Sequence, residues 1–220
     1  MAVISKSEVK RRIELPITHR KSLVITPLLE ARKMFSGDGD EDAIDLRLGT
    51  SFLLPQVPPQ TFVNPSKALG RQSPFRVHVP LGRFLVLPAH QTVLGATLEF
   101  IKLPDDLSGE ILTKSSIART FMVIETAPWI HPSYRGCLTL EIANVSNTPL
   151  ILYPGRLIGQ LILLELKIEK SDAKSQERKL SRTYLAPVYP EVPSFNDPAE
   201  DLSRIGISDS DIDSPYTRDL

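Results

Sequence analysis

Short apolar runs separated by prolines and polar turns make up most of this chain. The runs have the length and the branched or aromatic residues that are typical of β-strands. They cover residues 44–48, 75–79, 83–87, 92–103, 109–113, 121–125, 137–143, 150–153 and 157–168. The chain also contains 19 prolines, which favour short strands and sharp corners over long helices after residue 30. The pattern predicts a mainly β protein, built as a barrel or a sandwich.

Two segments depart from this pattern. Ser5 and Glu8 have the spacing of a capping box, and Val9 and Ile13 recur at helical spacing, so a short N-terminal helix is predicted over residues 5–15. At the other end, residues 191–220 contain eight acidic residues and two arginines with few large apolar side chains. Such a composition buries too little surface to offset its ordering entropy. We therefore expect one domain over residues 1–187 and a flexible acidic tail over residues 188–220.

Composition excludes several classes of protein. Lysine plus arginine and aspartate plus glutamate each number 26 in the 220 residues, so no overall charge attracts nucleic acid or an anionic membrane. No apolar run approaches the roughly 20 residues that cross a bilayer, and the N-terminus lacks a secretory pattern. The single cysteine, Cys137, agrees with a reducing compartment. We expect a cytoplasmic protein with no nucleic-acid or membrane partner.

The cysteine count also bears on metal chemistry. Zinc-dependent nucleobase deaminases need two or three cysteine ligands, and this chain has one. The four histidines (His19, His78, His90 and His131) lack ligand spacing. No zinc site and no other protein-held metal site is predicted.

Residues 114–119, with the sequence KSSIAR, are the first candidate for chemistry. Ser115 and Ser116 follow a predicted strand and precede a helical turn, where such residues most often serve as a cap. The alternative is an anion site, to which Lys114 and Arg119 add positive charge. The pattern alone leaves both interpretations open.

Glu141 is the second candidate, because of its place in a predicted strand. Leu138, Leu140 and Ile142 share one face of that strand, whereas Thr139 and Glu141 share the other. The carboxylate is therefore expected to point away from the aliphatic core. A catalytic role requires that this face be covered, so that loss of water raises the proton affinity of the carboxylate. Otherwise Glu141 is a solvated strand residue.

Five ordered motifs resemble the dCTP deaminase branch of the dUTPase-like superfamily. They are AIDLRLG at residues 43–49, KSSIAR at 114–119, TAPWIHP at 126–132, residues 136–144, and YPGRLIGQ at 153–160. The resemblance covers about residues 3–165. It implies a distorted β-barrel that forms a homotrimer with active sites between subunits. It also implies zinc-free deamination of dCTP to dUTP and ammonia, in which Mg²⁺ enters only through the triphosphate of the nucleotide.

The resemblance also implies roles for single residues. Glu141 is the general base that activates water for attack on C4 of cytosine, and Ser115 and Arg119 orient the water and the pyrimidine. The nucleotide-binding residues implied in the same way are Lys114, Ser116, Ala127, Trp129, His131, Thr139, Leu140 and Gln160. Lys114 stands where the family usually has arginine.

Two departures from the family pattern keep other functions open. His131 replaces an aspartate that meets the deoxyribose and, in dUTPases, orients water. The C-terminal lid motif is reduced to Tyr184 and its neighbours in residues 183–187. The alternatives are a bifunctional enzyme that also releases pyrophosphate, for which residues 134–136 (YRG) echo dUTPases, and a non-catalytic trimer that binds a nucleotide or a protein.

Overall fold

The computed structural model describes residues 2–27, 43–55, 74–124, 127–167 and 187–191. The chain divides into two compact units. The first comprises Met1–Pro55 and Phe75–Glu191, and the second comprises Gln56–Pro74 and Val192–Leu220. Only Pro74 of the second unit is among the described residues, so the fold and the candidate site below belong to the first unit.

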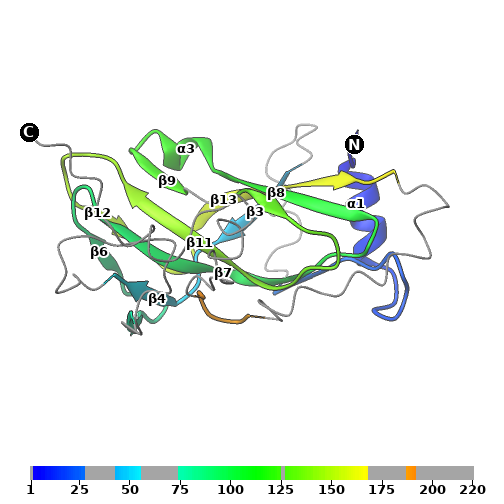
Figure 1. Ribbon diagram of the computed structural model, residues 1–220, viewed down its shortest axis with the longest axis horizontal. Coiled ribbons are helices and arrows are strands. Elements are labelled where there is room, and N and C mark those ends of the chain that lie inside the picture. The colour runs from blue at the N-terminus through cyan, green and yellow to red at the C-terminus, as the bar shows by residue number, and fades with distance from the viewer. Residues whose placement is uncertain (1, 28–42, 56–73, 125–126, 168–186, 192–220) are drawn as a thin grey trace, which may run out of the picture. The chain divides into compact units, whose positions relative to one another are not determined.

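The first larger sheet, sheet A, has five antiparallel strands (Figure 1). The strand order is β1-β13-β8-β10, and β3 also pairs with β13. The strands are β1 (Ala2–Val3), β13 (Leu157–Glu165), β8 (Leu107–Thr113), β10 (Trp129–Ile130) and β3 (Ala43–Arg47). Sheet A thus unites strands from the beginning, middle and end of the first unit.

The second larger sheet, sheet B, has six antiparallel strands in the order β5-β4-β7-β11-β9, with β2 also paired to β7. The strands are β5 (Phe75–His78), β4 (Ser51–Leu54), β7 (Thr92–Lys102), β11 (Arg135–Asn144), β9 (Met122–Ile124) and β2 (Val24–Thr26). A separate pair joins β6 (Leu85–Leu87) to β12 (Leu150–Leu152). The helices are α1 (Lys6–Ile13) and α3 (Ser115–Ala118).

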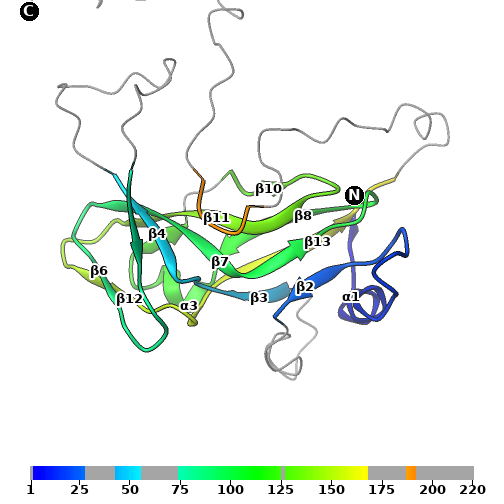
Figure 2. The same cartoon turned by 90° about the horizontal axis from the view of Figure 1, so that it is seen from below.

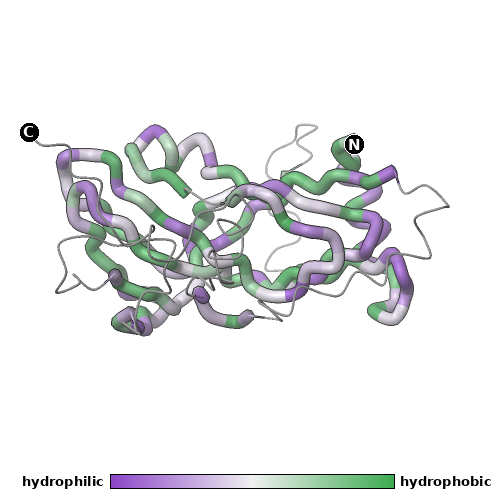
Figure 3. Tube along the Cα trace, in the orientation of Figure 1, coloured by the Kyte–Doolittle hydropathy of each residue, from purple (hydrophilic) through white to green (hydrophobic). Residues whose placement is uncertain are grey.

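The mainly β prediction is confirmed. Each of the nine predicted runs contains a strand, and along the long strands hydrophobic residues are interspersed with hydrophilic ones (Figure 3). The strands that the pattern missed are β1, β2, β4 and β10. The described strands form distorted, separate sheets rather than one closed barrel.

The hydrophobic core is built from the buried faces of both larger sheets. Sheet A contributes Ile44 and Leu161, which are at most 1% exposed, and sheet B contributes Phe52, Leu140 and Ile142. Residues that point to the opposite face, such as Thr139 and Glu141 on β11 and Gln160 on β13, are less buried, because side chains alternate between the two faces of a strand. The fold therefore leaves polar side chains on the outer faces of both sheets, where the candidate chemistry lies.

An ion pair inside the domain links the two sheets. Glu99 on β7 is fully buried, and its carboxylate accepts hydrogen bonds from the backbone N–H of Arg47 at 2.9 Å and from its guanidinium at 3.0 Å. Burial raises the pKa of Glu99 above its ordinary value, although the hydrogen bonds from Arg47 act in the opposite direction. Because both carboxylate oxygens are used within the fold, this pair has a structural role.

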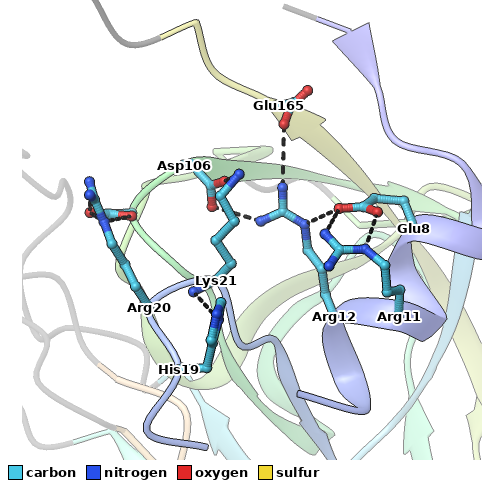
Figure 4. A network of polar contacts seen from close by, with 9 residues as sticks. Glu8, Arg11, Arg12, His19, Arg20, Lys21, Asp106 and Glu165 are labelled. Carbon is cyan, nitrogen blue, oxygen red and sulfur yellow. Dashed lines mark hydrogen bonds and ion pairs between the residues drawn. The ribbon is translucent and has the colours of Figure 1, made fainter. Parts of the chain in front are cut away.

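Helix α1 is fixed to sheet A through a buried arginine. The predicted cap is present, since the hydroxyl of Ser5 accepts the N–H of Glu8 at 3.4 Å. From the last turn, Arg12 reaches Glu8 and Asp106 at 2.7 Å each and Glu165 at 3.3 Å, and it is fully buried (Figure 4). We call these four residues the Arg12 cluster. No described helix is long and apolar enough to cross a membrane.

Residues 187–191 lie along the beginning of β11 and are called the docked segment (Figure 2, orange). The backbone N–H of Cys137 donates to the carbonyl of Pro187 at 2.7 Å, and the N–H of Glu191 donates to the hydroxyl of Thr139 at 3.2 Å. The predicted tail began at residue 188, and of its first residues Tyr189 lies under the guanidinium of Arg76 and Glu191 bonds to Thr139. Residues 192–220, like the lid residue Tyr184, lie outside the described residues.

Candidate functional site

The KSSIAR motif forms the short helix α3, which follows β8 directly. The N-cap is Lys114, whose carbonyl accepts the N–H groups of Ile117 at 2.8 Å and Ala118 at 2.9 Å. Ser115 and Ser116 are the first helical residues, and both are exposed to solvent, as is Arg119 after the helix. The hydroxyls predicted either to cap the helix or to meet an anion are therefore presented to solvent on α3.

The side chain of Lys114 turns inward to a buried carboxylate. Its ammonium group lies 2.8 and 3.0 Å from the two oxygens of Asp45, which is fully buried on β3. The amide of Gln160 on β13 donates to the same carboxylate at 3.2 Å. We call Asp45, Lys114 and Gln160 the Asp45 cluster. Two residues expected to bind the nucleotide thus meet at a third residue to which the sequence analysis gave no role.

A sequence signal for Asp45 was present but was not used. Residues 43–47 read AIDLR, so one acidic side chain interrupts an aliphatic strand whose neighbours Ile44 and Leu46 are buried. A carboxylate in such a strand needs a cation or hydrogen-bond donors if it is buried. Nothing in the sequence indicates which donors reach it, because Gln160 is 115 residues away along the chain.

Glu141 occupies the predicted face of β11. Leu138, Leu140 and Ile142 are buried at 6%, 0% and 0% exposure, whereas Thr139 and Glu141 are only partly buried. The predicted alternation is therefore confirmed, despite a register shift between Cys137 and Thr139. One oxygen of the Glu141 carboxylate, Oε2, is shielded from solvent. The side chain is thus neither a core residue nor a freely solvated one.

The register of sheet A places Trp129 near the Asp45 cluster. Asp45 lies opposite Gln160, and Gln160 lies opposite Leu112, so these three share a face of the sheet. Two residues along β8, Glu110 lies opposite Trp129 on the same face. Leu112 and Trp129 are 42% and 39% exposed. An indole, an amide and a lysine-bound carboxylate therefore occupy one outer face.

The predicted site residues consequently fall into two groups on different sheets. Trp129 and Gln160 belong to sheet A, and Lys114 directly follows β8 of that sheet, whereas Thr139, Leu140 and Glu141 belong to β11 of sheet B. The remaining residues lie on α3 or on connections between strands and are exposed: Ser115, Ser116, Arg119, Ala127 and His131. The contacts within one chain bring Lys114 and Gln160 together through Asp45.

Two titratable groups beside Glu141's strand have perturbed pKa values. Burial raises the pKa of Tyr134, whose hydroxyl donates to the carbonyl of Cys137 at 2.8 Å, and burial also raises the pKa of Cys137. Neither group is therefore an anion at neutral pH. Among the described residues, no group of three or more histidine, cysteine, aspartate or glutamate side chains is arranged to hold a metal ion.

Comparisons with known proteins agree with the motifs. A family model described as dCTP deaminase-like matches residues 3–166. The dUMP-forming dCTP deaminase of Dictyoglomus turgidum is 31% identical over 165 residues, which cover 74% of this chain and 80% of the relative. The dUMP-forming dCTP deaminase of Mycobacterium avium is 40% identical over 125 residues, covering 56% of this chain and 65% of the relative.

A solved structure is also similar. The 2′-deoxycytidine 5′-triphosphate deaminase of Agrobacterium tumefaciens matches with a TM-score of 0.52 and 20% sequence identity. The match covers 80% of this chain and 53% of that chain. At this identity the likeness concerns the fold.

Proposed function

We propose that this chain, which belongs to the dCTP deaminase-like family, hydrolyses the 4-amino group of dCTP to give dUTP and ammonia. The observation that carries the proposal is the position of Glu141. Its carboxylate lies on the outer face of β11 with Oε2 shielded from solvent. A partly desolvated carboxylate is suited to act as a general base on water when a pyrimidine binds beside it.

In the proposed reaction Glu141 accepts a proton from water while the oxygen attacks C4 of cytosine. The resulting tetrahedral centre collapses when the C4–N4 bond breaks, and Glu141 returns the proton to the leaving ammonia. Water and dCTP thus yield dUTP and ammonia, and Glu141 ends in its starting state. Ser115 and Arg119 orient the water and the pyrimidine, and Trp129 lines the base pocket together with the backbone of Ala127, Thr139 and Leu140.

The triphosphate and the sugar are assigned to four other residues. Lys114, Ser116 and Gln160 bind phosphate oxygens, and His131 meets the deoxyribose. Mg²⁺ bound through the triphosphate would neutralise part of its charge, since this cation prefers phosphate and water oxygens over a cage of protein ligands.

We further propose that the active enzyme is a homotrimer whose sites join residues of different subunits. The distribution of the site residues over two sheets supports this proposal, as does the solvent exposure of Ser115, Arg119 and Trp129. A second copy that covers these side chains would supply the dry environment that general-base chemistry needs. Light scattering of the purified protein measures the subunit number.

A complementation experiment tests the shared site directly. Glu141→Gln and Arg119→Gln subunits, each expected to be inactive alone, are refolded together in equal amounts. If Glu141 and Arg119 of one site come from different subunits, about a quarter of the sites carry both natural residues and activity returns in that proportion. If both come from one subunit, no site carries both, and the mixture stays inactive.

A second candidate function is the formation of dUMP. The names of the relatives from Dictyoglomus turgidum and Mycobacterium avium favour it, because both are called dUMP-forming. In this reaction the same chain would also release pyrophosphate from dUTP. His131, in place of the aspartate that orients water in dUTPases, is the residue that would have to serve the second step.

The products of dCTP distinguish these functions. The protein is incubated with dCTP and Mg²⁺, and ammonia, pyrophosphate, dUTP and dUMP are resolved by chromatography. Ammonia without pyrophosphate identifies a deaminase, and equal amounts of ammonia and pyrophosphate identify the dUMP-forming enzyme. Binding of dCTP without any product over a long incubation would contradict both and identify a non-catalytic trimer.

A further inference from the structure

Asp45 is a buried carboxylate whose partners come from two distant parts of the chain. It is fully buried on β3, and its oxygens receive the ammonium group of Lys114 at 2.8 and 3.0 Å. A third hydrogen bond comes from the amide of Gln160 at 3.2 Å. A buried carboxylate is strongly destabilising unless such donors surround it. The fold therefore keeps Lys114 and Gln160 in place whether or not a ligand is present.

The hydrogen-bonding capacity of Lys114 is only partly used by this contact. An ammonium group has three N–H donors, and two of them point to the oxygens of Asp45. The side chain of Lys114 is 20% exposed, so the third donor has access to the surface. The backbone is held as well, because the N–H of Lys114 donates to the carbonyl of Ile158 at 3.1 Å.

The amide of Gln160 is oriented in a similar way. Gln160 lies directly opposite Asp45 in the pairing of β13 with β3, and one of its N–H groups is used by the carboxylate. This bond fixes which side of the amide is the donor. Within the described part of the chain, no other hydrogen bond uses the second N–H or the carbonyl oxygen of this amide, and the side chain is only partly buried. Two polar groups with spare hydrogen-bonding capacity are thus set at one place by one carboxylate.

We infer that Asp45 is a positioning residue for the triphosphate of the substrate. It holds the Lys114 ammonium and the Gln160 amide in the orientation in which they receive phosphate oxygens, so that no ordering entropy is lost on binding. The inference rests on the proposed function for the identity of the nucleotide. It goes beyond that function, because Asp45 itself does not contact the substrate.

The sign of the effect makes the inference testable. If only net charge mattered, removing the negative charge of Asp45 would strengthen the binding of an anion. If Asp45 acts by positioning, its removal releases Lys114 and Gln160 and weakens the binding. The variant Asp45→Asn keeps the shape of the side chain while it removes the charge. The matched control is Asp105→Asn, which breaks the exposed ion pair of Asp105 with Arg20 at the opposite end of β8.

Steady-state kinetics with dCTP provide the first measurement. We expect KM to rise about tenfold in Asp45→Asn while kcat changes by less than about threefold, because the lost interaction is the same in the ground state and the transition state. Asp105→Asn should match the unmodified protein. An unchanged or lowered KM in Asp45→Asn overturns the inference. A tenfold fall in kcat with KM unchanged overturns it as well.

A double-mutant cycle protects the test against a folding defect. Asp45→Asn/Lys114→Met removes both charges of the pair, so no buried charge is left without a partner. Its KM should lie within about twofold of the Asp45→Asn value, since Lys114 no longer contributes once it is released. Independent, additive losses would show that Lys114 binds phosphate without Asp45, and the inference would be wrong.

Calorimetric titration with inorganic tripolyphosphate separates this inference from the proposed function. The natural chain and Asp105→Asn should bind the anion, and Asp45→Asn should bind it about tenfold more weakly. Weakening in a protein that does not deaminate dCTP would uphold the inference and overturn the proposed reaction. Equal binding by all three proteins would overturn the inference, whatever the activity with dCTP.

Discussion

The two ends of the β8–β13 strand pair carry buried ionic clusters of opposite design. Asp106 and Glu165 belong to the Arg12 cluster at the end where Glu165 lies opposite Leu107. Lys114 and Gln160 belong to the Asp45 cluster near the other end, where Gly159 lies opposite Thr113. One cluster surrounds a buried cation with acids, and the other surrounds a buried acid with donors.

The difference lies in what each cluster leaves available. The guanidinium of Arg12 uses three of its five N–H groups on carboxylates, and because it is fully buried the other two are closed to a ligand. The Lys114 ammonium and the Gln160 amide keep unused donors and partial exposure. The Arg12 cluster thus stabilises the fold by fixing α1, whereas the Asp45 cluster is the one to which we assign the anion in the inference above. The count of hydrogen bonds does not distinguish these roles; the solvent access of the remaining donors does, since the Lys114 side chain is 20% exposed and Arg12 is fully buried.

The largest effect is expected from Arg12→Leu, which leaves Glu8, Asp106 and Glu165 without their shared cation. The free energy of unfolding should fall by about 3–5 kcal/mol, as measured by urea denaturation. The kcat of the remaining folded protein should not change, because Arg12 belongs to the stabilising end. The exposed Arg20 provides the control, since Arg20→Leu should cost less than about 1 kcal/mol. A selective loss of kcat in Arg12→Leu would remove the distinction between the two clusters.

The docked segment sharpens the comparison, because it contacts the strand of Glu141 without belonging to either cluster. Gly136 has a φ of +146°, and a Cβ there would lie 2.5 Å from Cδ of Pro187. Gly136→Ala should lower the free energy of unfolding by about 1–3 kcal/mol and speed proteolysis near residue 187. Gly82, with a φ of +83° and open space around it, is the control for backbone strain alone. Equal protease resistance in both variants would contradict the docking contact.

Acid should weaken the Arg12 cluster. Hydrogen bonds from Arg11 lower the pKa of Glu8 from 4.5 to about 2. Partial burial acts in the opposite direction, and the hydrogen bond from Arg12 adds to the lowering. Burial alone would raise the pKa of Asp106, but Arg12 and Lys21 hold it below its ordinary value. These carboxylates therefore stabilise the fold at pH values above their ordinary pKa values, and the stabilisation is lost as the pH falls toward 2.

The expected loss is small because Glu8 is 30% exposed and partly screened by solvent. Urea denaturation between pH 6 and pH 3 should show about 1–2 kcal/mol of lost stability in the natural chain. In Arg12→Leu the contribution of Asp106 should be lost while Arg11 still lowers the pKa of Glu8, so the pH dependence should be weaker but not absent over the same range. The same pH dependence in both proteins would contradict the assignment.

Local patterns were sufficient to predict much of the fold. The cap of α1 at Ser5, the nine strand runs and the alternation around Glu141 all depend on residues within a few positions of one another. The strands that were missed are two to four residues long, and pairing with distant strands forms them. An example is β10, which has two residues and exists through its pairing with β8.

The candidate site was harder to predict from sequence. The motifs indicated Lys114 and Gln160, but the sequence analysis left the lysine charge free for phosphate. In the fold Lys114 is bound to Asp45, 69 residues earlier in the chain. The separation of the site residues onto two sheets was equally hidden, because it depends on the pairing of β3 with β13 and of β11 with β7.

The most direct test of the account is ammonia release from dCTP by Glu141→Gln. This change keeps the size of the side chain and removes its ability to accept a proton. The account predicts that kcat falls by about 10²–10⁴-fold while calorimetric dCTP binding stays within about threefold of the natural chain. Ammonia release at the rate of the natural chain would contradict the assignment of Glu141 as the general base.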